Sequence, residues 1–280
     1  MYSNVKVKLL FIMILFVIWN MVTSPFAFYN LTIIPIVRSH RMFYTVYSSG
    51  IVLSILSIIA MCMTDFEKLK KKDYYIAIFF ALVTLFPILV NASSASIPFA
   101  VITFFGYLAS VTLANESTYK MPIFTSTKFR DIAFDIGLSI AVTIGYFIFM
   151  FILGGDFVDI LLKTFQTTGV QTTVSNIIWP LATSMSEEVV FRMFLFYVVI
   201  KLNKNEKVPF ITMVLILSIP FALWHRIDQM FHSGIIYIMN EGIIIYLGGI
   251  IFSVVALKRN LFVAILVHFL NNFIIESILF

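Results

Sequence analysis

Apolar segments of about 20 residues recur along the whole 280-residue chain, and they constrain its fold more than any other feature. A helix needs about 20 such residues to cross a bilayer core of about 30 Å. Nine candidate segments are present, at about 9–28, 44–63, 74–91, 97–114, 132–153, 177–200, 209–225, 235–257 and 261–279. We therefore expect an all-α, polytopic membrane bundle of about eight or nine transmembrane helices.

Composition excludes a soluble globular domain. The chain is 61% hydrophobic and 12% charged, whereas soluble domains are about 45–50% apolar and about 25% charged. The net charge of +5 does not indicate nucleic-acid binding, because the basic residues lie mainly in short loops. The single cysteine, Cys62, excludes an internal disulfide or a cysteine-based metal cluster.

Lys and Arg are distributed unevenly between alternate loops. A cytoplasmic N-terminus places most of the 19 basic residues on the cytoplasmic side, as the positive-inside rule requires. The predicted outer loops hold only four of them: Arg38, Arg41, Lys163 and Arg226. Richness in Ile, Phe, Lys and Asn is typical of a low-GC bacterium, so we expect an integral multi-pass protein of a bacterial cell membrane with its N-terminus in the cytoplasm.

A pair of carboxylates interrupts the apolar segment that follows Pro180. A charge at the bilayer centre costs about 2.5–3.5 kcal/mol on insertion scales, so Glu187, Glu188 and Arg192 indicate a functional site. Glu188 and Arg192 are four residues apart and share a helix face, so they can pair. Glu187 points about 100° away. We expect Glu187 to act as a general base and the Glu188–Arg192 pair to support it.

Two later apolar segments carry polar residues at helical spacing. Phe221 and His225 lie one turn apart, and so do His268 and Asn272. An imidazole and a carboxamide on one face can donate hydrogen bonds to an oxyanion. At a rise of about 1.5 Å per residue, Glu187 and Asn272 both reach mid-membrane, whereas His225 lies nearer the outer surface. These depths permit one shared site.

The three motifs occur in the order seen in the CPBP family, which contains CAAX prenyl endopeptidases and bacteriocin-processing or Abi-type intramembrane proteases. They are Glu-Glu-x-x-x-Arg at 187–192, Phe-x-x-x-His at 221–225 and His-x-x-x-Asn at 268–272. The resemblance covers about residues 175–280. It divides the chain into N-terminal membrane helices of unassigned role, 1–131, and a CPBP/Abi-like catalytic membrane core, 132–280.

The resemblance implies an intramembrane endopeptidase that hydrolyses a peptide or a membrane-associated protein. It assigns activation of the hydrolytic water to Glu187 with His225, and stabilisation of the oxyanion to His268 and Asn272. The other matching positions support the site: Glu188, Arg192 and Phe221. The bilayer and the substrate are the only partners expected, and no nucleic acid is among them.

A metal-free glutamate mechanism is favoured by the resemblance, and the chain contains no His-Glu-x-x-His motif. If zinc is bound, its ligands are Glu187, His225 and His268. Two other functions stay open: a non-catalytic bacteriocin-immunity or peptide-binding membrane protein, and a proton-coupled transporter, since buried acids and histidines also form proton relays. The substrate is not identified, nor whether proteolysis would serve peptide maturation or immunity.

A lone acid in the span at 132–153 and a pair of adjacent glycines have structural explanations. Asp135 is expected near the cytoplasmic end of its span. Gly248 and Gly249 are expected to permit close packing between membrane helices, where small residues let backbones approach.

Overall fold

The computed structural model describes residues 66–90, 96–125, 128–153, 174–230 and 234–279, together with the single positions Ile55 and Ile58. Side chains between 223 and 243 are outside this description. Within the described ranges every regular element is helical and no strand occurs. The prediction of an all-α fold is therefore confirmed for this part of the chain.

Each of the seven later predicted spans coincides with a helical segment. In chain order, after the short turn η2 (Phe66–Lys68), these are α3 (Lys71–Leu85) with η3 (Phe86–Val90), α4 (Ser96–Asn115), α5 (Phe129–Leu153), the continuous stretch α7 (Val174–Glu188), η4 (Val189–Phe194) and α8 (Leu195–Leu202), α9 (Phe210–Met230), α10 (Gly234–Lys258) and α11 (Leu261–Leu279). The spans predicted at 9–28 and 44–63 lie outside the described residues, apart from the two single helical positions.

Two described segments are long and apolar enough to cross a membrane by length and composition, Lys71–Leu89 and Phe129–Ile152. Among the described residues, α4, α9, α10 and α11 contain shorter apolar runs of 10–17 residues. A membrane bundle fits these helices, and the total of eight or nine transmembrane helices stays a prediction.

Helix α5 presents apolar side chains outward and polar side chains inward. Isoleucines at every fourth position are exposed: Ile136, Ile140, Ile144, Ile148 and Ile152. On the inner face Asp135, Ser139 and Thr143 are buried. The two hydroxyls donate to backbone carbonyls one turn earlier, at 2.8 and 2.9 Å. A helix at a water-exposed surface shows the opposite pattern, so this arrangement favours contact with lipid.

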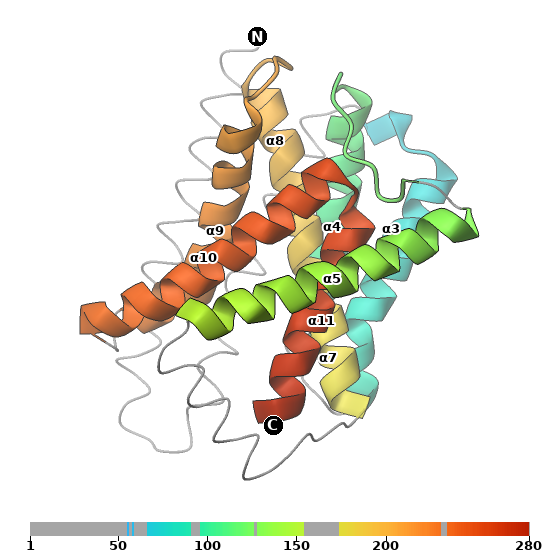
Figure 1. The fold of residues 1–280 in the computed structure, drawn as a ribbon. Helices are drawn as coiled ribbons and strands as arrows, with labels where there is room; N and C mark the ends of the chain where they lie inside the picture. Colours follow the sequence, from blue (N-terminus) through green and yellow to red (C-terminus); the bar gives the residue numbers. More distant parts are fainter. Residues whose placement is uncertain are drawn as a thin grey trace, which may run out of the picture.

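Helix α11 lies at the centre of the described bundle, where it packs against α7, α5 and α10. Figure 1 shows α5 and α10 running obliquely across the more upright helices. The segment η4 packs against α4 and α9. The elements that carry the first and third motifs, α7–η4 and α11, are therefore direct neighbours.

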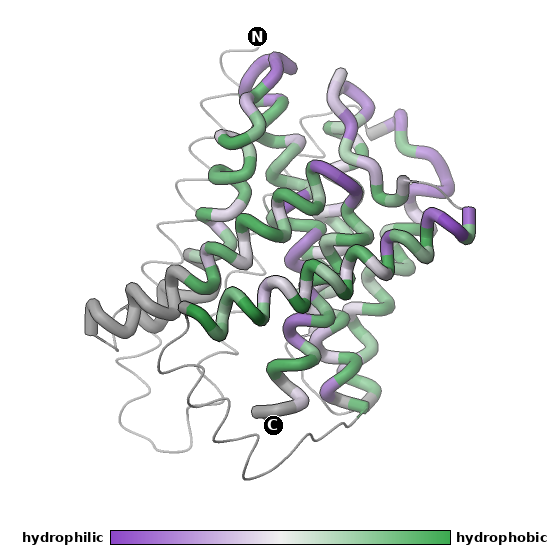
Figure 2. Tube along the Cα trace, in the orientation of Figure 1, coloured by the Kyte–Doolittle hydropathy of each residue, from purple (hydrophilic) through white to green (hydrophobic). Residues whose placement is uncertain are grey.

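Loops predicted to share the cytoplasmic side lie together at one end of the bundle. Lys201, at the end of α8, pairs with Glu116 after α4, and Asn205 donates to the backbone of Glu116 at 3.2 Å. Leu261 at the start of α11 donates to the carbonyl of Pro122 at 3.0 Å. Figure 2 shows these hydrophilic segments gathered at the upper end of the view. Their proximity agrees with the alternation of loops that the basic residues indicate.

Candidate active site

A π-helical segment, η4, begins directly after Glu188 within the helical stretch 174–202. Such segments are rare and occur frequently at functional sites, because the wider turn reorients the side chains that follow. All six residues of η4 are buried. The wide turn could not be predicted, because Val189, Val190 and Phe191 read as an ordinary apolar helix.

The side chains of Arg192 and Glu188 form a fully buried ion pair. Arg192 Nη1 lies 3.1 Å from Glu188 Oε1, and neither side chain is exposed. Arg192 Nη2 also donates to the carbonyl of Gly249 on α10 at 3.2 Å. The guanidinium lies over two phenyl rings, 4.2 Å from the centroid of Phe221 and 5.5 Å from that of Phe252. The predicted pairing of Glu188 with Arg192 is confirmed.

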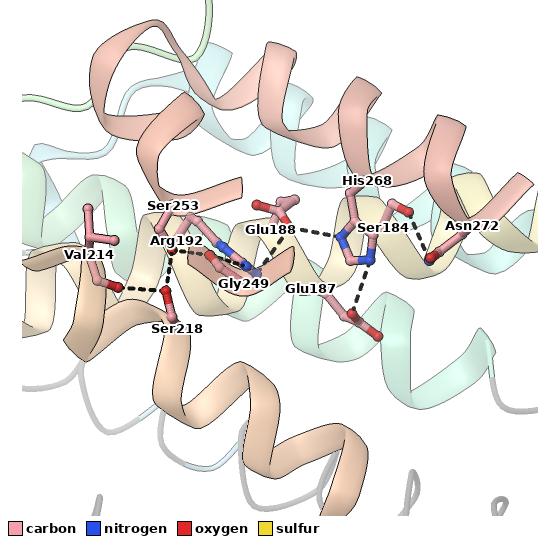
Figure 3. A network of polar contacts seen from close by, with 10 residues as sticks. All are labelled: Ser184, Glu187, Glu188, Arg192, Val214, Ser218, Gly249, Ser253, His268 and Asn272. Atoms are coloured by element: carbon pink, nitrogen blue, oxygen red, sulfur yellow. Dashed lines mark hydrogen bonds and ion pairs between the residues drawn. The ribbon is translucent and has the colours of Figure 1, made fainter. Parts of the chain in front are cut away.

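The first and third motifs meet at His268. Its Nδ1 lies 2.8 Å from Glu188 Oε1, the same oxygen that faces Arg192. Its Nε2 lies 3.6 Å from Glu187 Oε2, beyond hydrogen-bond distance. Both glutamates and His268 are buried. Figure 3 shows the imidazole between the two carboxylates. Glu187 thus stays outside the contact between Glu188 and Arg192, and it faces the other nitrogen of the same imidazole.

Two aromatic rings enclose the imidazole. Phe252 stacks on His268 with ring centroids 4.5 Å apart and an angle of 19° between the planes. Phe221 approaches edge-on, with centroids 5.5 Å apart at 79°. The supporting position predicted for Phe221 agrees with these contacts. Phe252 belongs to no motif, and among 31 phenylalanines no sequence signal distinguishes it.

Asn272 contacts α7 through a long hydrogen bond, in which its Nδ2 donates to Ser184 Oγ at 3.4 Å. Asn272 is only partly buried, whereas Ser184 is fully buried one turn before Glu188. Figure 3 shows Ser184 and Asn272 beside His268. The amide therefore lies next to the cluster of acids and imidazole without belonging to its tight hydrogen bonds. Ser184 was not singled out from the sequence.

Helices α9 and α10 approach closely at the glycine pair. A Cβ atom on Gly249 would lie 3.0 Å from Phe221 Cδ1, and one on Gly248 would lie 2.9 Å from Tyr146 Oη on α5. Both distances are too short for an ordinary contact. The predicted role of the pair in close helix packing is confirmed. Contact at this point also brings the Gly249 carbonyl within reach of Arg192.

His225 lies in α9, one turn after Phe221, and its side chain is outside the described residues. Of the three ligands predicted for a zinc ion, the structure therefore brings together Glu187 and His268. Among the described side chains, no group of three or more His, Cys, Asp or Glu residues could hold a metal ion.

Asp135 lies near the start of α5, as predicted, but it is buried in a polar cluster rather than solvated. Arg259 Nε donates to Asp135 Oδ1 at 2.5 Å, and Asn260 Nδ2 donates to Oδ2 at 2.9 Å. Asn260 Oδ1 accepts the backbone N–H of Val263 at 2.8 Å, which caps the N-terminus of α11. The cluster holds the turn from which the helix of His268 begins.

Comparison with known proteins places these residues in a family. Residues 169–274 match the family model of type II CAAX prenyl endopeptidase Rce1-like proteins. The matched range contains all three motifs, and the family is one of membrane-embedded proteases. No curated protein and no solved structure matches the chain. Over residues 169–274 the chain thus matches the Rce1-like, CAAX-type protease family, as the resemblance of its motifs to CPBP proteases predicts.

Proposed function

We propose that the protein is an intramembrane endopeptidase that hydrolyses a peptide or a membrane-associated protein. The observation that carries the proposal is the buried cluster of Glu187, Glu188, Arg192 and His268 inside a protease-family domain. Burying these groups in a membrane bundle costs several kcal/mol before their mutual pairing is counted. Structural packing alone does not require such a cluster, whereas hydrolysis of an amide by activated water uses a positioned general base.

In this proposal Glu187 is the general base. Its carboxylate removes a proton from a water molecule held jointly with His225, and the water oxygen attacks the scissile carbonyl carbon. The C–N bond then breaks, and the proton taken by Glu187 is returned to the departing amine. The contribution of His225 rests on the family resemblance. That of Glu187 is supported by its burial and by its position opposite His268 Nε2.

Stabilisation of the oxyanion is assigned to His268 and Asn272. Because Glu188 occupies His268 Nδ1, the imidazole can reach a substrate only through Nε2, on the side of Glu187, and it donates to the oxyanion there in its doubly protonated form. Asn272 Nδ2 makes only a 3.4 Å contact to Ser184, so little hydrogen-bond energy opposes its rotation toward a substrate oxygen. Removal of one such donor typically costs about 10²–10³-fold in kcat.

We propose that the reaction needs no metal ion. Arg192 supplies a positive charge beside the two carboxylates, which lowers the cost of burying them. A general base acting on water is a sufficient source of the nucleophile. Zinc held by Glu187, His225 and His268 is the competing possibility, and a chelator distinguishes it.

The test compares Glu187→Gln with wild type in lipid nanodiscs. Suitable probes are a farnesylated peptide with a C-terminal CAAX sequence, the same peptide without the prenyl group, and membrane proteins of the host analysed for new termini by mass spectrometry. Glu187→Gln keeps the size of the side chain and removes the base, so we expect cleavage to fall by about 10²–10⁴-fold. Glu206→Gln, in the exposed turn after α8, is the matched control and is expected to cleave like wild type.

Cleavage by Glu187→Gln at the wild-type rate would refute the proposal. Peptide binding by wild type without any new terminus would favour the binding or immunity function. Proton-coupled flux that is lost in Glu187→Gln, in the absence of proteolysis, would favour the transporter.

A further inference from the structure

The hydrogen bond between His268 and Glu188 requires a proton on one particular imidazole nitrogen. Glu188 Oε1 lies 3.1 Å from Arg192 Nη1 and 2.8 Å from His268 Nδ1. The carboxylate of Glu188 forms an ion pair with Arg192, and an ionised carboxylate has acceptors only. Nδ1 is therefore the donor, and Nε2 is the atom directed to Glu187.

One hydrogen bond does not hold an imidazole in a single orientation. The ring can still rock about the line joining Nδ1 to Glu188 Oε1, and such rotation moves Nε2 away from Glu187. The face of Phe252, 4.5 Å from the imidazole and nearly parallel to it, opposes that rotation. The ring of Phe221 packs against the imidazole nearly at right angles, with ring centroids 5.5 Å apart.

Phe252 is itself held from two sides. Its ring meets Phe221 edge-on at 5.9 Å and Tyr146 at 6.3 Å. Its side chain is 2% exposed. The phenyl ring of Phe252 thus forms one buried, packed side of the His268 site. It comes from α10, a helix that carries none of the three motifs.

We propose that Phe252 is a positioning residue, whose ring fixes the plane of the His268 imidazole so that Nε2 faces Glu187 while Nδ1 stays bonded to Glu188. The effect of Phe252 on catalysis rests on the proposed endopeptidase function. The effect of Phe252 on the orientation of His268 does not rest on that function, and this orientation can be measured without a substrate.

The direct measurement is the ¹⁵N spectrum of the imidazole. The chain has four histidines, so ¹⁵N-histidine labelling gives four ring systems, and His268→Gln identifies the relevant one. Magic-angle-spinning spectra in lipid are compared for wild type, Phe252→Leu and the control Phe80→Leu. Phe80 is also a buried ring, 5% exposed, that packs on Tyr107 in the α3–α4 part of the core.

In wild type and in Phe80→Leu we expect His268 to show a protonated Nδ1 in one sharp population, with its ring protons shifted upfield by the stacked phenyl ring. In Phe252→Leu we expect broadened signals or a second population. A His268 spectrum unchanged by Phe252→Leu, or an unprotonated Nδ1 in wild type, overturns the proposal. If Phe252→Leu does not fold, Phe252→Met makes the same comparison, and the wild-type upfield shift tests the stacking without any substitution.

Kinetics then separate the two proposals. With the peptide probe, Phe252→Leu is expected to lower kcat by about tenfold or more at unchanged KM, since a 1 Å misplacement in an active site can cost about 100-fold. Phe80→Leu is expected to keep the wild-type kcat. Expected spectra without hydrolysis in wild type would refute the endopeptidase and leave the positioning role intact. Hydrolysis at equal kcat in wild type and Phe252→Leu would refute the positioning role alone.

Discussion

Replacement of Arg192 by methionine tests whether the buried ion pair holds the site together. The substitution keeps an apolar chain of similar length but removes both contacts of the guanidinium, to Glu188 Oε1 and to the Gly249 carbonyl. Glu188 is then a buried carboxylate that keeps His268 as a partner and loses its positive charge.

The expected loss of stability follows from these contacts. Removing one partner of a buried ion pair costs about 3–5 kcal/mol, because it leaves an uncompensated charge. Losing the hydrogen bond to a buried carbonyl adds about 1–3 kcal/mol. Packing of methionine against Phe221 and Phe252 offsets part of this loss. We therefore expect the free energy of unfolding of Arg192→Met to fall by about 3–5 kcal/mol.

The assay is a double-mutant cycle of unfolding in mixed micelles, with Arg192→Met, Glu188→Met and the double variant. Replacing a buried pair by apolar residues is often nearly neutral, so the double variant should be closer to wild type than either single variant. Lys201→Met breaks the partly exposed pair with Glu116 and serves as control. Its expected cost is about 0–1 kcal/mol. Additive costs of the two site variants, or a cost for Arg192→Met no larger than that of Lys201→Met, would refute the reasoning.

Three further outcomes are expected. Gly249→Ala should lower the free energy of unfolding by about 1–3 kcal/mol, because its Cβ would lie 3.0 Å from Phe221. The control Gly137→Ala, whose Cβ would meet nothing within 4 Å, should not destabilise the protein. Equal melting temperatures of the two variants would contradict this expectation. Asn260→Ala removes the cap at the Val263 N–H, so thermal unfolding should show a free energy of unfolding lower by about 0.5–2 kcal/mol. If kcat falls by more than this destabilisation accounts for, α11 has shifted. Peptide cleavage should persist after prolonged treatment with a zinc chelator, and recovery of lost activity by added zinc would contradict the metal-free mechanism.

Much of the helical architecture could be predicted because each span is a local property. About 20 apolar residues in sequence predict a helix whatever its neighbours are, and all seven spans within the described ranges lie where expected. Pairing of Glu188 with Arg192 was predictable for the same reason, since four residues along one helix bring two side chains together. The three motifs also indicated the protease family that residues 169–274 match.

The rest of the site depends on which helices become neighbours, which spacing along one helix does not determine. The sharing of one Glu188 oxygen by Arg192 and His268 requires α7–η4 and α11 to lie side by side. The stacking of Phe252 on His268 requires α10 to approach at its glycines. The π-helical turn after Glu188 could not be predicted either, because its residues form an ordinary apolar run.

The sequence by itself determined the all-helical architecture of the described ranges and the pairing of Glu188 with Arg192, because these follow from apolar length and helical periodicity. Only the tertiary structure decided which nitrogen of His268 faces which carboxylate, and that a phenyl ring from outside the motifs stacks on the imidazole. Contacts between helices are set by the fit of whole surfaces, and in a chain this rich in apolar side chains many pairings are nearly equivalent until the backbones are placed.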